Sequence, residues 1–94
     1  MANADEDGNL SAIELARAAL TTVEELTGHR SEAATGLEWD GESWRVTVEV
    51  LEMSRIPSTT DVLGSYEVRL DGQGTLRGYK RLRRFNRGEA RDEQ

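Results

Sequence analysis

Apolar residues change their spacing once along this chain, from the period of a helix to the alternation of a strand. Between residues 11 and 27 they recur three or four positions apart, which is the pattern of an amphipathic helix. From residue 35 onward they alternate with polar residues, most clearly in Trp44 to Val50, which predicts strands with one buried face. The order of the two patterns therefore predicts one helix followed by a sheet.

The predicted helix has recognisable signals at both ends. Ser11 is a favoured N-cap residue, and Glu14, three positions on, completes a capping box. Leu10 and Leu15 have the spacing of a hydrophobic staple across this cap. Gly28 stands where a helix commonly ends in the left-handed backbone conformation. We therefore expect a helix over residues 11–27.

Turn residues divide the remaining chain into four predicted strands. The first, over 35–39, ends at the two-residue turn Asp40-Gly41, which would pair Leu37 with Trp44 on the second strand, 44–50. A loop around Pro57 precedes the third strand, 62–70, and a Gly-Gln-Gly hairpin loop leads into the fourth, 76–85. In this register Leu70 pairs with Leu76, and apolar residues stay on one face.

The α-β-β-β-β order predicts an α+β fold, in which one N-terminal amphipathic helix packs on one face of a four-stranded antiparallel β-meander. The other face would remain open and polar. At 94 residues the chain suffices for a single core. We predict a disordered acidic tail at 1–9, one α+β domain at 10–88 and a charged tail at 89–94.

Composition excludes several classes of function. The chain has no Cys and one His, so thiolate chemistry is absent and His29 has no evident co-ligands for a metal. We expect no catalytic residues, no cofactor and no metal. The sequence also lacks the long apolar run of a membrane helix and the apolar segment of a signal peptide, which favours a cytoplasmic location.

Charge is distributed unevenly along the chain. Residues 1–76 carry 5 basic and 15 acidic side chains, whereas residues 77–94 carry 7 basic and 3 acidic ones. The basic residues of the second group lie mainly on the fourth predicted strand. Strand alternation would place five of its side chains together on the open sheet face: Arg77, Tyr79, Arg81, Arg83 and Phe85.

The fourth strand has three interpretations. Its charges could protect a sheet edge against aggregation, or they could form a docking surface for an acidic protein, with Tyr79 and Phe85 as anchors. Binding of single-stranded nucleic acid is the third, although the overall acidity opposes it. Lys80 and Arg84 fall on the nominal core face, so either a β-bulge exchanges the faces midway or their side chains reach outward from an edge.

The loop before the third strand is a secondary candidate site, formed by Arg55, Ile56, Pro57, Thr60 and Asp61. A simpler explanation is geometric, because Pro57 stiffens the connection while Thr60 or Asp61 accepts hydrogen bonds from backbone groups.

Several blocks of the sequence are similar to one known family. They are LARAAL at 15–20, ELTG at 25–28, WRVTVEV at 44–50, Arg55-Ile56-Pro57, Asp61-Val62-Leu63, Tyr66-Glu67-Val68 and Gly78-Tyr79 with the following arginines. In this order they resemble the gas vesicle protein O family, over most of the chain outside the acidic N-terminus.

The resemblance implies a non-catalytic accessory protein for gas vesicle assembly, located in the cytoplasm or on forming gas vesicles. Its partners would be other gas vesicle proteins, including the shell protein or an AAA-type ATPase, bound through the face that carries arginine and aromatic side chains. The alternative is a regulatory nucleic-acid-binding protein that controls gas vesicle gene expression. The net negative charge of the chain argues against nucleic acid as a partner.

Overall fold

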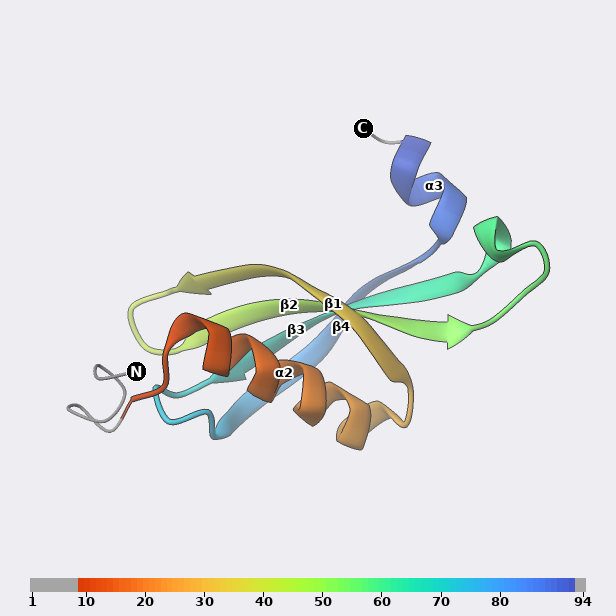
Figure 1. Cartoon of the computed structure of the whole chain (residues 1–94). Helices are drawn as coiled ribbons and strands as arrows, with labels where there is room; N and C mark the ends of the chain where they lie inside the picture. Colours follow the sequence, from red (N-terminus) through yellow and green to blue (C-terminus); the bar gives the residue numbers. More distant parts are fainter. Residues whose placement is uncertain (1–8, 93–94) are drawn as a thin grey trace.

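The computed structural model describes residues 9–92 and shows one long helix followed by a four-stranded antiparallel sheet (Figure 1). Its elements are α2 (Ala12–Thr27), β1 (Arg30–Trp39), β2 (Trp44–Met53), the 3-10 turn η1 (Ser58–Thr60), β3 (Val62–Leu70), β4 (Leu76–Asn86) and the short helix α3 (Arg87–Asp92). The strands neighbour one another in chain order. The predicted α+β arrangement is therefore confirmed. Of the predicted tail at 1–9, all but Asn9 lies outside the described residues.

Helix α2 begins and ends at the residues that its sequence signals predict. The Ser11 hydroxyl accepts a hydrogen bond from the Glu14 amide, and the Glu14 carboxylate accepts one from the Ser11 amide, which completes the capping box. Gly28 follows the last turn at φ 75° and donates its N–H to the Glu24 carbonyl, the left-handed ending that glycine favours.

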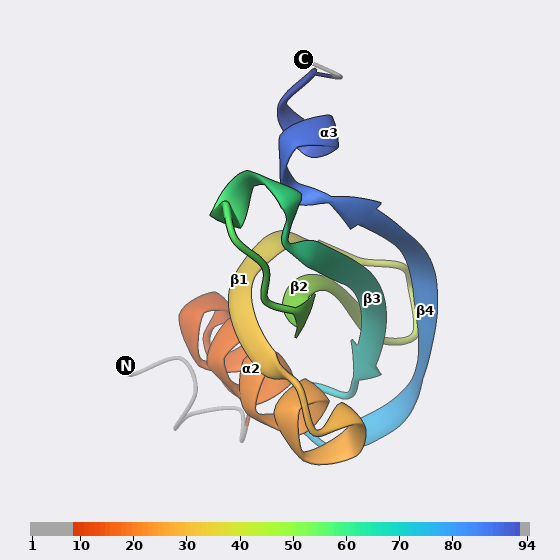
Figure 2. The same ribbon diagram turned by 90° about the vertical axis from the view of Figure 1, so that its right-hand side faces the viewer.

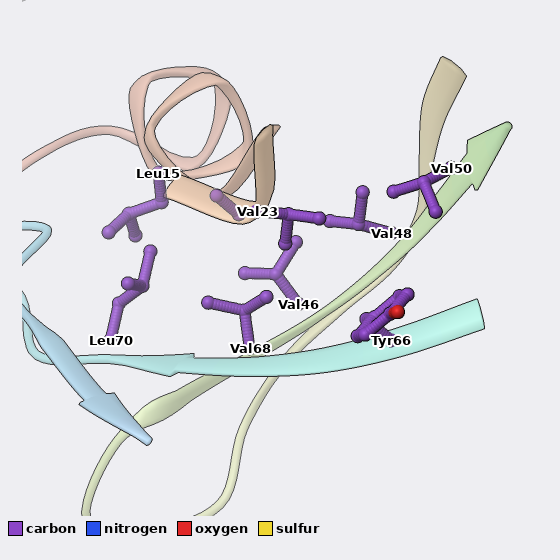
Figure 3. Packing of buried hydrophobic residues seen from close by; sticks show 9 residues of the cluster. Leu15, Val23, Val46, Val48, Val50, Tyr66, Val68 and Leu70 are labelled. Atoms are coloured by element: carbon purple, nitrogen blue, oxygen red, sulfur yellow. The ribbon is translucent and has the colours of Figure 1, made fainter. Parts of the chain in front are cut away.

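The core lies between α2 and one face of the sheet (Figure 3). Its members are apolar apart from one tyrosine hydroxyl: Leu15, Ala19, Val23, Val46, Val48, Val50, Tyr66, Val68 and Leu70. The three helix residues lie one turn apart, and the strand residues are alternate positions of β2 and β3, so the two predicted periods meet in one cluster. The helix contacts β1, β2 and β3.

The first strand is longer than predicted, since β1 begins at Arg30 rather than at residue 35. Polar and small residues occupy this part of the strand, so it lacks the alternating apolar pattern that predicts a strand. The predicted two-residue turn is also wrong, because Trp39 rather than Leu37 pairs with Trp44. The Asp40 carboxylate accepts hydrogen bonds from the amides of Glu42 and Ser43, which favours a four-residue turn.

Two irregularities in β4 displace the predicted register. Leu70 pairs with Leu76 as expected, but Arg69 then pairs with Gly78, which leaves Arg77 as an extra residue. Further along, adjacent residues of β3 pair with Arg81 and Arg83, so Leu82 is extra. Each extra residue exchanges the two faces of the strand, because side chains alternate at every position.

The sheet is strongly curled, with β1 and β4 at its two edges (Figure 2). Its face opposite α2 is not uniformly polar as predicted, because Leu51, Leu63 and Phe85 lie opposite one another across three strands. Leu63 and Phe85 are buried. Residues 89–92 of the predicted charged tail belong to the short helix α3.

Candidate protein-binding surface

The structure places the five predicted residues of the fourth strand on β4, but it divides them between the two faces of the sheet. Tyr79 and Arg81 pair with core residues of β3, and therefore lie on the same side as α2. Arg83 and Phe85 pair with Ser65 and Leu63 and lie on the opposite side. The prediction that all five share one open face is therefore wrong, and the alternative of a bulge that exchanges the faces is confirmed.

Lys80 and Arg84, whose positions the sequence left open, also lie on opposite faces. Lys80 pairs with Glu67 on the face away from α2, whereas Arg84 pairs with Gly64 on the face toward it. The side of β4 toward α2 consequently carries Tyr79, Arg81 and Arg84. These three side chains all remain accessible to solvent, because β4 is the outermost strand of the sheet.

Glu52 holds the arginines on this side. Its carboxylate lies 3.5 Å from Arg81 Nη2 and 3.4 Å from Arg84 Nε, while its side chain is only 5% exposed. The Tyr66 hydroxyl donates a hydrogen bond of 3.0 Å to the same carboxylate. The pKa of Arg81 is raised by its hydrogen bond with Tyr66 and by the charge of Glu52. Two guanidinium groups are thus fixed at one place on the surface.

The space for the Glu52 carboxylate depends on Gly64. A Cβ atom at position 64 would collide with the Glu52 carboxylate and would lie 3.2 Å from the Tyr66 ring. The Tyr66 ring in turn stacks on Tyr79, with ring centroids 6.5 Å apart. The accessible Tyr79 ring is therefore attached to the core through Tyr66, which limits its freedom before any partner binds.

On the opposite face, Phe85 is unsuited to the anchoring role that the sequence predicts for it. Its side chain is 7% exposed, and the Arg83 guanidinium lies 4.4 Å from the ring centroid in a cation–π contact. Phe85 therefore helps to bury the second apolar row. Arg83 itself is exposed at the edge of this face.

The exposed charges of β4 define what this surface can bind. We call the exposed basic and aromatic side chains of this strand the β4 surface, and its members are Arg77, Tyr79, Lys80, Arg81, Arg83 and Arg84. Guanidinium groups present several donors in one plane, which suits bidentate binding of carboxylates. The chemistry available is recognition of anionic groups beside an aromatic ring.

The secondary candidate loop is tied down by Asp61. The Asp61 carboxylate accepts a 2.7 Å hydrogen bond from the Arg55 amide and lies 3.1 Å from Arg87 Nη2. These contacts, led by the Arg55 amide, lower the pKa of Asp61. Thr60 donates from both its amide and its hydroxyl to the Pro57 carbonyl. The geometric explanation is therefore confirmed for Asp61, whereas the Thr60 hydroxyl donates to a backbone carbonyl instead of accepting from a backbone amide.

One loop residue is not accounted for by this geometry. Ile56 is 99% exposed, although the residues on both sides of it are held by hydrogen bonds to Asp61 and Thr60. The loop is thus ordered at its base and presents an apolar side chain at its tip.

Sequence reasoning missed Glu52 and did not assign Arg84 to the surface. Glu52 is extra in the pairing of β2 with β3, because Leu51 pairs with Leu63 and Met53 with Val62. No alternating pattern predicts the face on which its side chain lies.

Within residues 9–92, no three His, Asp or Glu side chains stand close enough together to hold a metal ion. No helix in this part of the chain combines the length and apolar character needed to cross a membrane.

Comparison with known proteins gives one consistent family. A family model described as gas vesicle synthesis protein GvpO matches residues 1–91. Gas vesicle protein O of a Streptomyces species is 42% identical over 80 residues, which cover 85% of this chain and 62% of that protein. Gas vesicle protein O1 of Halobacterium salinarum is 39% identical over 71 residues, covering 76% of this chain and 60% of that protein.

A third relative, gas vesicle protein O of Haloferax mediterranei, is 41% identical over 54 residues, covering 57% of this chain and 39% of that protein. The chain thus spans less than two thirds of the length of each of these relatives. No solved structure matches it. With a family model that matches nearly its whole length, the chain belongs to the gas vesicle protein O family.

Proposed function

We propose that this chain is a non-catalytic accessory protein of gas vesicle assembly, which binds another gas vesicle protein through the β4 surface. The observation that carries the proposal is the row of exposed arginines on an edge strand, two of them fixed by the buried Glu52 carboxylate. The family, described by its part in gas vesicle synthesis, supports the accessory role. Candidate partners are other accessory proteins, the shell protein or an AAA-type ATPase, met in the cytoplasm or on forming vesicles.

The chemistry of β4 indicates an acidic partner. Arginine and tyrosine are enriched among the residues that dominate binding energy at protein interfaces, and Tyr79 is 44% exposed. Because Glu52 and Tyr66 already restrict Arg81 and Tyr79, less side-chain entropy is lost when a partner carboxylate binds. An acidic segment that lies along β4 would meet guanidinium groups on both sides of the strand.

Charge reversal on β4 tests this proposal. We expect Arg81→Glu/Arg83→Glu to abolish capture of gas vesicle proteins from cells that express the whole gene cluster. Since Glu at 81 would repel Glu52, a second variant, Arg81→Gln/Arg83→Gln, removes the charges without this repulsion. The matched control, Arg17→Glu/Arg30→Glu, makes the same change in net charge at two exposed arginines outside β4.

The outcomes are distinct. Loss of capture in both β4 variants, with capture and melting temperature preserved in the control, supports binding through this surface. Capture that is unchanged in the folded Gln variant overturns it. Salt-sensitive binding of single-stranded RNA or DNA that depends on the same arginines would favour the regulatory alternative instead.

A further inference from the structure

The two ends of this molecule carry complementary features. The molecule measures 47 Å along its longest axis. The loop of residues 54–57 follows the end of β2, and the β1–β2 and β3–β4 turns lie at the other end (Figure 1). The ten residues of β2 separate the ends by roughly 30 Å, at about 3.3 Å a residue. A group at one end therefore cannot reach the other end of the same chain.

An exposed apolar side chain projects from the first end. Ile56 is 99% exposed, and hydrogen bonds fix the loop on either side of it: the Arg55 amide binds Asp61, and the Pro57 carbonyl accepts from Thr60. Arg87 links Asp61 to Glu32 of β1, with Nη2 3.1 Å from Asp61 Oδ2 and 2.9 Å from Glu32 Oε2. The loop thus forms a rigid apolar knob, which has little conformational entropy to lose on binding.

An apolar pocket lies at the opposite end. Its volume is about 430 Å³, and it is lined by Asn9, Trp39, Trp44 and Gly72. The two tryptophan rings lie 5.4 Å apart at a tilt of 55°, and Trp39 is 52% exposed. Exposed tryptophan beside a pocket is a common anchor of protein interfaces. The pocket has room for a branched aliphatic side chain.

The turns at one end and the loop at the other carry side chains of opposite charge. The turns at 40–43 and 71–75, beside the pocket, contain Asp40, Glu42 and Asp71 and no basic residue. The loop at 54–60 contains Arg55 and no acidic residue. Contact between the two ends of different molecules would therefore join an apolar knob to an apolar pocket and a cation to a group of carboxylates.

We propose that this chain associates with itself head to tail, with Ile56 of one copy in the Trp39–Trp44 pocket of the next. Knob and pocket lie at opposite ends, so the contact is heterologous, and every open assembly still offers one free knob at one end and one free pocket at the other. Such contacts generate open chains rather than closed dimers unless the rotation closes a ring. The small contact makes the association reversible and concentration-dependent.

Complementary variants of the purified chain test this arrangement in sedimentation experiments. Ile56→Asp removes the apolar knob, and Trp39→Ala removes one of the two tryptophan side chains that line the pocket. We expect the unmodified chain to grow beyond a dimer as its concentration rises, and each variant alone to associate at least about tenfold more weakly. A 1:1 mixture of the two variants should form a dimer and nothing larger, because only one matching pair of ends remains.

Controls separate this contact from general stickiness and from misfolding. Leu82→Asp changes another exposed apolar residue, 46% exposed on β4, and should leave self-association unchanged. Glu42→Lys alters only an exposed turn residue beside the pocket, and should weaken association even if Trp39→Ala does not fold.

A chain that remains monomeric at millimolar concentration, or association that persists in Ile56→Asp, overturns the proposal. The experiment contains no other protein, so its result is independent of binding through β4.

Discussion

The Tyr66 hydroxyl donates a 3.0 Å hydrogen bond to Glu52 Oε2, and this contact connects the core to the β4 surface. Tyr66 belongs to the core cluster beneath α2, whereas the Glu52 carboxylate also pairs with Arg81 and Arg84. A single buried carboxylate therefore has two roles. It satisfies a buried hydroxyl, and it sets the positions of two exposed guanidinium groups.

Replacing Glu52 by alanine should weaken both parts of this arrangement. We expect Glu52→Ala to lower the free energy of unfolding by about 1–3 kcal/mol, because the buried Tyr66 hydroxyl loses its acceptor. Urea denaturation measures this loss. Tyr66→Phe removes the donor instead, and the double variant should lose less than the sum of the two single losses. Strict additivity would show that the two groups do not interact.

The register of β4 predicts unequal roles for its two aromatic residues. Phe85 is 7% exposed and Tyr79 is 44% exposed. We expect Phe85→Ala to lower the free energy of unfolding by about 3–5 kcal/mol, as in other buried sites. Tyr79→Ala should lower the free energy of unfolding by clearly less than Phe85→Ala does. Melting temperatures of the two variants give the comparison, and equal losses would be incompatible with the observed pairing of β4.

The helix, the class of fold and most strand positions were predictable because local signals agree there. The capping box at Ser11, the glycine at 28 and the alternation of Trp44 to Val50 each point to one conformation, and the structure confirms them. Leu37 also lies on the predicted face of the sheet, although its predicted pairing partner is wrong. Its partner is Val46 rather than Trp44, but a shift of two residues keeps a side chain on the same face.

The faces of β4 were not predictable, because a β-bulge has no signature in this stretch of sequence. The bulges at Arg77 and Leu82 add single residues where arginines occupy both faces, so no apolar pattern records the change. Glu52 was missed for the same reason on β2. The composition of the candidate site was therefore visible in the sequence, while the grouping of its side chains required the pairing of the strands.

The capping box provides a test of the helix that the sequence predicts. We expect Ser11→Ala to lower the free energy of unfolding by about 1 kcal/mol, because the Glu14 amide loses the hydroxyl that accepts its hydrogen bond. Thermal unfolding followed by circular dichroism measures the change. Ser54→Ala, at an exposed loop position, is the matched control and should stay within about 0.5 kcal/mol of the unmodified chain. Equal effects of the two substitutions would argue against the cap.

Asp61 should make the stability of the chain depend on acid. The Arg55 amide, and then Arg87, hold the pKa of the Asp61 carboxyl below its ordinary value of 3.8, so the folded state favours the ionised form. The stability that results is fully present above the ordinary pKa and is lost as the pH falls through the lower folded value.

Asp61→Asn isolates this contribution, because an amide oxygen can still accept from the Arg55 amide but carries no charge for Arg87. We expect the variant to be less stable than the unmodified chain at neutral pH. The difference in free energy of unfolding should shrink as the pH falls below the ordinary pKa of 3.8, because the native carboxyl then takes up its proton. Urea titrations at a series of pH values measure the difference. A gap that stays constant over this range would mean that the charge of Asp61 contributes nothing to the fold.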